Sequence, residues 1–308
     1  MTSNLIKTSF KLNDDDLFDD DLLNNDDSLR ESLDDENDDG SSDDSSDSSD
    51  DLNKISGLEG DDDLEGLVGR DHLEGKEGDD HIDAGDGDDS VEGGDGDDSV
   101  EGGDGDDDIN GNQGEDSILG GLGDDHIRGG KGNDTLKGGD GIDSLIGNLG
   151  DDDIAGNQGS DTLSGGDGYD EIHGGKDDDD VNGNADDDDI YGDKGDDDLK
   201  GGKGNDTIKG GEGNDEIKGN KGDDLLFGGD GLDTFIFKIG FGNDTIGDFV
   251  SGADTLKFDS GIFTDEQDAL DNAVASGSDT LIQVDSGNSI TLTGIDVTTL
   301  SISDFIVS

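Results

Sequence analysis

The chain has 308 residues and a formal net charge of −70, because 88 acidic residues stand against only 18 basic ones. This charge argues against binding nucleic acid through its phosphates and predicts a soluble protein that attracts cations. The chain contains no cysteine, which excludes disulfides and thiol chemistry, and no apolar stretch approaches the length of a membrane-spanning helix.

The first 54 residues are predicted to form an acidic, disordered tail. Residues 40–51 consist only of Gly, Ser and Asp, and low hydrophobicity with high net charge is typical of disorder. We interpret this segment as a solvated spacer, and a tail that binds cations or mineral diffusely is the alternative. The first ten residues lack the apolar stretch of a cleaved signal peptide, which by itself favours the cytoplasm.

A nine-residue repeat begins at Ile55 and continues to Phe235. An apolar residue stands at every ninth position, 21 times in succession, in a chain that is only 25% hydrophobic. With this residue counted as position 8, glycine occupies position 1 in 19 of 20 units and position 4 in 18 of 20. Because Gly and Asn accept positive φ, we expect positions 1–6 to form a tight loop and positions 7–9 a short strand. A fixed period of this kind predicts a solenoid.

Position 6 is aspartate in every unit, and these side chains are the candidate metal ligands. Calcium prefers six to eight hard oxygen ligands, and glycine-rich loops can turn carbonyl oxygens toward one point. Two carboxylates stacked at strand spacing, about 4.8 Å, repel each other by roughly 3.5 kcal/mol at a dielectric constant near 20. We therefore hypothesise that folding and metal binding are coupled. The 20 candidate ligands are Asp62, Asp71, Asp80, Asp89, Asp98, Asp107, Asp116, Asp125, Asp134, Asp143, Asp152, Asp161, Asp170, Asp179, Asp188, Asp197, Asp206, Asp215, Asp224 and Asp233.

The unit, which is clearest at residues 93–101, resembles the nonapeptide of the repeats-in-toxin (RTX) family of calcium-binding proteins. The resemblance covers residues 55–235 and implies an all-β fold, a calcium-bound parallel β-roll solenoid. It further implies that two nonapeptides make one coil, that position 8 fills a thin core, and that multiple Ca²⁺ ions lie between stacked loops. Position-6 carboxylates and loop carbonyls would hold these ions.

Some units depart from the pattern. In the opening units, residues 55–80, position 2 is Leu58, Leu67 or Lys76, so we expect weak metal binding and a capping role there. Asp177 and Asp186 replace the glycine of position 4, which puts the local metal sites in doubt.

Position 9 changes from mostly acidic in the early units to mostly basic in the later ones. An ordinary solvated strand surface is the simpler interpretation, and a polarised face for a partner is the alternative.

The four histidines occupy positions 7 and 9 and are expected to point outward. The sequence contains no His-Glu-x-x-His motif, P-loop or serine elbow, and the array lacks the glutamate and flanking helices of an EF-hand.

After Phe235 the nine-residue phase breaks, and residues 236–308 are predicted to form a small, mostly β cap on the open end of the solenoid. Alternation predicts strands near 234–238, 244–249, 254–258, 279–285 and 289–293. A possible capping box of Thr264 and Gln267 predicts a helix near 265–275 that ends at Gly277.

The same segment resembles the C-terminal region of RTX proteins, which is an uncleaved signal for type I secretion. The features that carry this resemblance are residues 242–249, Asp304 and the apolar residues 305–307. The resemblance implies the type I secretion machinery as a partner and an extracellular location. A chain that is unfolded at low cytosolic calcium could then thread the exporter and fold outside the cell.

We expect a secreted, non-enzymatic calcium-binding protein. Larger members of the family carry protease, lipase, cyclase or pore-forming domains before their repeats, and the 54 residues found here are too few for a catalytic fold. An enzyme, a toxin or an enzyme accessory module is therefore the less favoured alternative. A surface-layer, adhesion or matrix component differs from the first expectation only in its partner.

Overall fold

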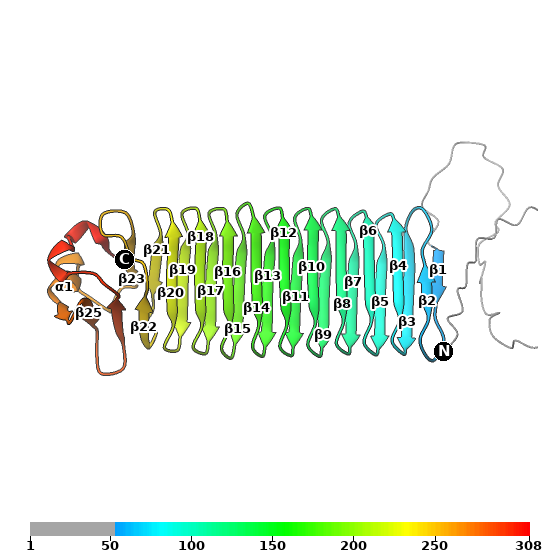
Figure 1. The fold of residues 1–308 in the computed structure, drawn as a ribbon, viewed down its shortest axis with the longest axis horizontal. Helices are drawn as coiled ribbons and strands as arrows, with labels where there is room; N and C mark the ends of the chain where they lie inside the picture. Colours follow the sequence, from blue (N-terminus) through cyan, green and yellow to red (C-terminus); the bar gives the residue numbers. More distant parts are fainter. Residues whose placement is uncertain (1–52) are drawn as a thin grey trace, which may run out of the picture.

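The computed structural model describes residues 53–308, and Figure 1 shows them as a long solenoid with a small cap at its C-terminal end. The predicted tail, residues 1–54, lies outside the described residues except for its last two. Asn53 and Lys54 belong to the first strand.

Two sheets form the two faces of the solenoid, and consecutive strands of the repeat array alternate between them. We name them sheet A and sheet B. Neighbouring strands are parallel in both sheets, except for the last two pairs of sheet B, which are antiparallel. Sheet A contains, in spatial order, β1 (Asn53–Ser56), β3 (Asp71–Glu77), β5 (Ser90–Asp95), β7 (Asp108–Gln113), β9 (His126–Lys131), β11 (Ser144–Leu149), β13 (Thr162–Asp167), β15 (Asp180–Ala185), β17 (Asp198–Lys203), β19 (Glu216–Lys221), β21 (Thr234–Phe237), β23 (Thr255–Phe258) and β27 (Phe305–Val307). Sheet B contains β2 (Asp63–Glu65), β4 (His81–Asp86), β6 (Ser99–Asp104), β8 (Ser117–Leu122), β10 (Thr135–Asp140), β12 (Asp153–Gln158), β14 (Glu171–Lys176), β16 (Asp189–Lys194), β18 (Thr207–Glu212), β20 (Leu225–Asp230), β22 (Asn243–Ile246), β26 (Ser289–Leu292), β25 (Asp279–Gln283) and β24 (Ala273–Ser276).

Each coil of the regular array is 18 residues long, so two nonapeptides make one turn, as the RTX resemblance implied. Leu73 pairs with Val91, and Val91 pairs with Ile109, without any shift of register. The position-8 side chains from Leu73 to Phe235 are at most 3% exposed. The predicted core of one apolar residue per unit is therefore confirmed, and a parallel register keeps every such residue on the inside.

The strands are longer than the sequence pattern predicted. A typical strand such as β5 runs from position 7 to position 3 of the next unit, so only positions 4–6 form the loop. The predicted left-handed residues do occur at position 2 (Gly94, φ 134°) and position 4 (Gly96, φ 143°). They do not end the sheet, because the Gly96 N–H donates to the Gln113 carbonyl of the next coil at 2.8 Å. The hydrogen-bonded ladder thus continues around the corner.

The C-terminal segment continues both sheets and closes the solenoid with a predominantly β cap. Its core is rich in phenylalanine. Phe237 packs against Phe241 and Phe258 with ring centroids 5.0 and 5.4 Å apart, and Phe258 meets Phe263 edge-on at 4.9 Å. Two short 3₁₀ turns, Val297–Thr299 and Ile302–Asp304, precede the final strand.

The predicted cap helix is shorter than expected. Helix α1 spans Glu266–Asp271 and begins at Asp265, whose carboxylate accepts a hydrogen bond from the Asp268 N–H at 2.9 Å. Thr264 is therefore not the N-cap residue. Residues 273–276, predicted as the helix end, form β24 because they pair antiparallel with β25. Across residues 53–308, no helix is long and apolar enough to cross a bilayer.

Candidate metal centre

The structure arranges the position-6 aspartates in two columns, one along each edge of the solenoid. Within a column, from Asp80 and Asp89 onward, the Oδ1 atom of each aspartate accepts a hydrogen bond from the backbone N–H of the position-6 residue one coil earlier. Asp98 N donates to Asp116 Oδ1 at 2.9 Å, and Asp116 N donates to Asp134 Oδ1 at 2.9 Å. One column precedes the strands of sheet B: Asp62, Asp80, Asp98, Asp116, Asp134, Asp152, Asp170, Asp188, Asp206 and Asp224. The other precedes the strands of sheet A: Asp71, Asp89, Asp107, Asp125, Asp143, Asp161, Asp179, Asp197, Asp215 and Asp233.

The second carboxylate oxygen of these aspartates is buried without a partner. From Asp80 to Asp233 every one of them is at most 3% exposed, and its Oδ2 atom has no hydrogen bond within the described residues. Burial raises the pKa of Asp107 to about 7 and that of Asp179 and Asp188 to about 8. A buried carboxylate oxygen in this state is costly unless a positive charge or a donor faces it.

Glycine occupies position 1 in every unit except the one that holds Ala84. Its role is to leave space rather than to allow the left-handed geometry that we expected. A Cβ added to Gly93 would collide with Asp98 Oδ2 and would lie 2.9 Å from the carbonyl oxygen of Gly111, one coil further on. A Cβ on Gly147 would meet Asp152 Oδ2 and the Gly165 carbonyl oxygen in the same way. The unpartnered carboxylate oxygen and a backbone carbonyl oxygen therefore border the same space.

These donors fit calcium. All of them are oxygens, and a hard cation with flexible coordination prefers a mixed set of carboxylates and carbonyls. Among residues 53–308 no three His, Cys, Asp or Glu side chains converge on one point, so a cation would need backbone carbonyls as well. The Oδ2 atoms of position 6 and the carbonyls of position 1 are the groups that would hold it, and the ion would supply positive charge between like-charged carboxylates.

The first aspartate of each column differs from the rest, which agrees with the predicted capping role of the opening units. Asp62 Oδ2 accepts a hydrogen bond from the Leu58 N–H at 2.6 Å, and Asp71 Oδ2 accepts one from the Leu67 N–H. Each carboxylate thus closes its own loop. We expect weaker metal binding at Asp62 and Asp71 than in the middle of the array.

Both columns extend beyond the residues that the repeat identified. Asp244 and Asp254 continue them, because their Oδ1 atoms accept from the Asp224 and Asp233 N–H groups at 3.2 Å. Asp244 Oδ2 is buried and unpartnered, and burial raises its pKa to about 8, whereas Asp254 Oδ2 accepts from the Val250 N–H. The sequence signal for both was the Asp-Thr-apolar spacing at residues 244–246 and 254–256, which two insertions shift out of the nine-residue phase.

A second ladder at position 5, which the sequence interpretation missed, runs in the opposite direction along the exposed loop edge. Asp106 Oδ1 accepts from the Asp124 N–H at 2.9 Å, and Asp124 Oδ1 accepts from the Ile142 N–H at 2.8 Å. These carboxylates already have donors and lie in solvent.

Asp177 and Asp186, which replace the glycine of position 4, adopt left-handed φ angles of 70° and 76°.

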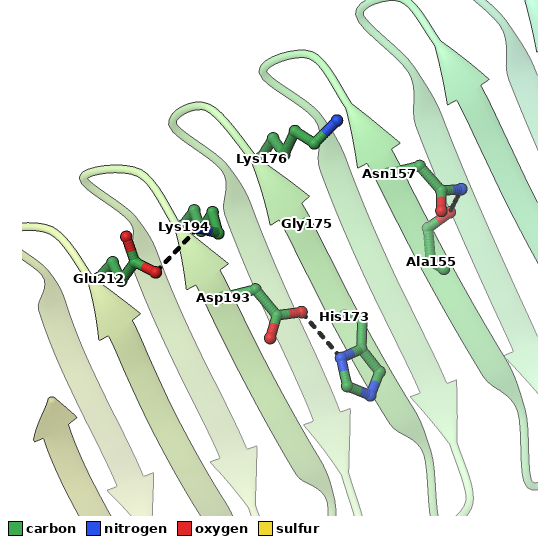
Figure 2. A pocket seen from close by; sticks show the side chains of 8 residues that line it. All are labelled: Ala155, Asn157, His173, Gly175, Lys176, Asp193, Lys194 and Glu212. Atoms are coloured by element: carbon green, nitrogen blue, oxygen red, sulfur yellow. Dashed lines mark hydrogen bonds and ion pairs between the residues drawn. The ribbon is translucent and has the colours of Figure 1, made fainter.

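The histidines lie on the outer faces of the sheets, as predicted. Figure 2 shows His173 in a shallow groove of about 570 Å³ across β12–β18 of sheet B. Its Nδ1 atom lies 2.9 Å from Asp193 Oδ2, and Lys194 Nζ lies 2.8 Å from Glu212 Oε1. The His173 ring also stacks on Tyr191 with centroids 4.4 Å apart. Lys176, which also lines the groove, donates to Gln158 Oε1 at 2.8 Å, so each of these polar side chains already has a partner within the chain.

A family model for the RTX calcium-binding nonapeptide repeat (4 copies) matches nine segments that together cover residues 38–235. These segments are 38–73, 65–100, 101–136, 128–163, 137–172, 155–190, 164–199, 173–208 and 200–235. A search of curated proteins found no match.

Two solved structures illustrate the structural matches. The extracellular lipase LipA from Serratia marcescens matches with 20% identity and a TM-score of 0.26 over 63% of this chain and 40% of the lipase. The AlgE6R3 subunit from the Azotobacter vinelandii mannuronan C5-epimerase matches with 23% identity and a TM-score of 0.29, over 48% of this chain and 80% of that subunit. This chain thus spans less than half of the lipase's length.

Proposed function

The chain belongs to the RTX calcium-binding nonapeptide repeat family, and on that premise we propose that it is a secreted, non-enzymatic protein whose solenoid folds when it binds multiple calcium ions. Calcium binding by an RTX β-roll follows from the family. The coupling to folding, the ligands and the destination are our proposals. The observation that carries them is the set of buried Oδ2 atoms without a partner, from Asp80 to Asp244, repeated in nearly every coil.

The position-6 carboxylates and the position-1 glycines shape the space in which the ions would bind. The hydrogen bond from the previous coil fixes each carboxylate, so that its Oδ2 points toward the position-1 glycine. Burying the single apolar side chain of a unit gains roughly 1.5–3 kcal/mol, whereas ordering the backbone costs roughly 1–2 kcal/mol for each of its nine residues. Ladder hydrogen bonds add a net of about 1 kcal/mol each. A bound cation that removes carboxylate repulsion then decides whether the coils stack.

Isothermal titration with calcium tests this proposal. The ten predicted aspartates of each column have nine gaps, and Asp244 or Asp254 adds a tenth, so the titration should count up to 20 ions. The Asp62 and Asp71 gaps should fill last, because those Oδ2 atoms already have donors. Binding of only one or two ions to the whole chain would contradict a repeated site.

We also propose that the chain leaves the cell unfolded and folds where calcium is abundant. In the folded cap, Asp304 is buried and accepts from Gly252 N at 2.9 Å and Ser251 Oγ at 2.8 Å, and the following strand β27 joins sheet A. Asp304 and Phe305, at most 3% exposed in the folded cap, are accessible to an exporter only before folding. Removing residues 300–308 should leave the protein inside the producing cell, and undiminished secretion would count against the proposal.

A matrix or adhesion role differs in where the protein remains after export. Blotting of culture medium, surface fraction and cytoplasm distinguishes the two. We expect the protein in the medium, and retention on the cell surface would favour the matrix role.

A further inference from the structure

The outer face of sheet A is polarised in charge along the solenoid. Its outward side chains stand at positions 7, 9 and 3 of each unit. The early strands β3, β5 and β7 carry an acidic end that contains Glu74, Glu77, Glu92, Asp95 and Asp108. The late strands from β17 to β23 carry a basic end that contains Lys200, Lys203, Lys218, Lys221, Lys238 and Lys257. Six of the chain's 18 basic residues thus gather on one part of one face.

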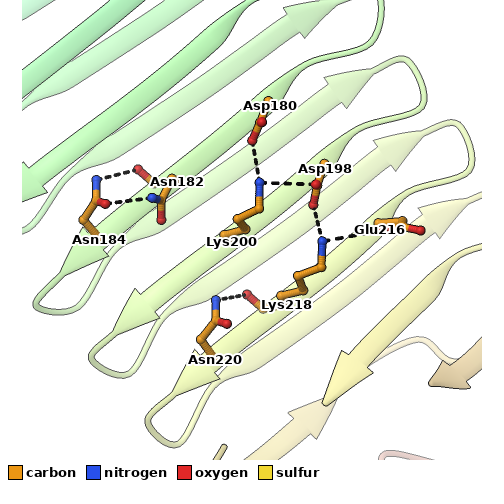
Figure 3. A network of polar contacts seen from close by, with 8 residues as sticks. All are labelled: Asp180, Asn182, Asn184, Asp198, Lys200, Glu216, Lys218 and Asn220. Carbon is orange, nitrogen blue, oxygen red and sulfur yellow. Dashed lines mark hydrogen bonds and ion pairs between the residues drawn. The ribbon is translucent and has the colours of Figure 1, made fainter. Parts of the chain in front are cut away.

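Part of the basic end is already neutralised, as Figure 3 shows. Lys200 Nζ lies 2.6 Å from Asp180 Oδ1, and Lys218 Nζ lies 2.6 Å from Asp198 Oδ1. Lys203, Lys221 and Lys238 are exposed, and no ion pair reaches them within residues 53–308. They line a shallow groove of about 410 Å³.

The acidic end carries a groove of similar size, about 450 Å³, lined by Glu74, Glu92 and Asp95 and also by Lys76 and Lys131. Three acidic side chains against two lysines leave it a net charge of −1, whereas the groove at the basic end is lined by three lysines and no acidic side chain. The acidic groove lies over β3–β9, and the basic groove lies over β15–β21. The two are equally far from the boundary between β11 and β13 in the strand order. One face therefore carries two grooves of opposite charge, placed symmetrically about its centre.

We propose that this face binds a second copy of the chain, with the two solenoid axes antiparallel and a two-fold axis that runs parallel to the strands between β11 and β13. A closed two-fold interface uses the same patch on both copies. With this axis, each row of side chains meets the same row in reverse order. Asp95 of one copy then faces Lys221 of the other, Glu92 faces Lys218, and Glu77 faces the Lys238 end.

The complementarity holds along the rest of the face. Arg128 and Lys131 of β9 face Asn182 and Ala185 of β15, so positions 9 and 3 place no two like charges opposite each other in the described strands. In the position-7 row, Asp108 faces Asp198. Each of these two already has a cation of its own copy, Arg128 at 3.0 Å and Lys218 at 2.6 Å.

The face is large enough for a stable interface. Strand spacing of about 4.8 Å over about 11 strands, with strands about 20 Å long, gives roughly 1,000 Å² for each copy. A standard stable interface needs about 800 Å². Ile146 and Leu149, the latter 46% exposed, project from β11 beside the proposed axis. With the proposed axis they face Ser164 and Asp167 of β13 in the second copy, so the centre combines apolar and polar side chains and the oppositely charged pairs lie toward its two ends.

Analytical ultracentrifugation of the full chain in saturating calcium tests this proposal, with charge reversals at exposed positions. The basic-end variant is Lys221→Glu/Lys238→Glu, and the acidic-end variant is Glu77→Lys/Asp95→Lys. The unmodified chain should dimerise. For each variant alone, the dissociation constant of the dimer should rise by about 100-fold or more, because like charges then face each other. An equimolar mixture of the two variants should recover the dimer, because both charged contacts become attractive again.

A matched control reverses two exposed aspartates at the same positions of sheet B, Asp86→Lys/Asp104→Lys, and should leave the dimer unchanged. Circular dichroism in calcium confirms that every variant is folded. Three results would overturn the proposal: a monomer at all concentrations, equal weakening by the sheet B control, or no recovery in the mixture. Monomers whose basic end binds only added poly-aspartate would show that it receives a different acidic chain, which also overturns it.

Discussion

Replacing one column aspartate by asparagine should have opposite effects on stability with and without calcium. Asp107 is 2% exposed, its Oδ1 accepts from the Asp89 N–H at 2.8 Å, and its Oδ2 has no partner. Asparagine preserves the first contact and removes the buried charge. Its amide would also lie beside the Gly120 carbonyl oxygen, which borders the same space. The metal-free solenoid should therefore become more stable.

The size of the effect follows from the pKa. Burial raises the pKa of Asp107 from 3.8 to about 7, which corresponds to at most about 4 kcal/mol at neutral pH, or about 2 kcal/mol after solvent screening at the loop edge. In calcium the sign reverses, because a ligand is lost. Asp107 borders two gaps, one toward Asp89 and one toward Asp125. With an affinity typical of extracellular sites, each ion lost at about 10 mM calcium costs roughly 1.5–3 kcal/mol. The loss of both ions, roughly 3–6 kcal/mol, outweighs the roughly 2 kcal/mol that the metal-free solenoid gains.

Asp106→Asn is the matched control, because it removes the same charge from the adjacent, exposed residue and keeps its contact with the Asp124 N–H. Folding in excess chelator can be driven with trimethylamine oxide and followed by circular dichroism, and stability in calcium can be measured with urea. Asp107→Asn should fold at less osmolyte than the unmodified chain and unfold at less urea. Equal behaviour of the two variants, or a destabilised metal-free Asp107→Asn, would refute the reasoning.

Three further predictions concern the same columns. Gly138 and Ala84 both occupy position 1. Gly138→Ala would push a Cβ into Asp143 Oδ2, so calorimetry should count at least one ion fewer, whereas Ala84→Gly should increase the calcium affinity. Unchanged stoichiometry and affinity in both variants would contradict the spatial role of position 1. Asp186 adopts a left-handed φ of 76°, which is strained for a residue other than glycine. Asp186→Gly removes this strain and should stabilise the calcium form by about 1 kcal/mol, measured as a higher melting temperature. A lower melting temperature would count against the strain. Burial raises the pKa of Asp89 to about 6 and that of Asp188 to about 8. The protons that such groups bind on folding make the metal-free solenoid less stable as pH rises from about 4 to 8, while calcium affinity falls as pH drops through the same range. Titrations at several pH values in two buffers should show proton release on calcium binding, and an affinity independent of pH between 5 and 8 would be inconsistent with buried carboxylate ligands.

The sequence determined the parts of the fold that repeat. An apolar residue at every ninth position placed the core correctly from Leu73 to Phe235, and the invariant aspartate two residues earlier identified both columns. A periodic pattern of this kind carries information because each unit needs the same residue on the same side.

The parts that were missed depend on contacts between coils, which a single unit does not reveal. The six-residue strands result from backbone hydrogen bonds that continue past the left-handed corner at Gly94. The need for glycine at position 1 arises from a carboxylate five residues further on. Asp244 and Asp254 were overlooked because insertions in the cap change the coil length to 20 and 21 residues while the column contact persists. Helix α1 is short because β25 recruits the residues that follow it.

Far-ultraviolet circular dichroism of the purified full chain, in excess EDTA and then in saturating calcium, tests the central claim most directly. If carboxylate columns stack only around cations, the EDTA spectrum should be that of an unfolded chain and calcium should convert it to a β spectrum, reversibly. A β spectrum in EDTA that calcium leaves unchanged would contradict the account.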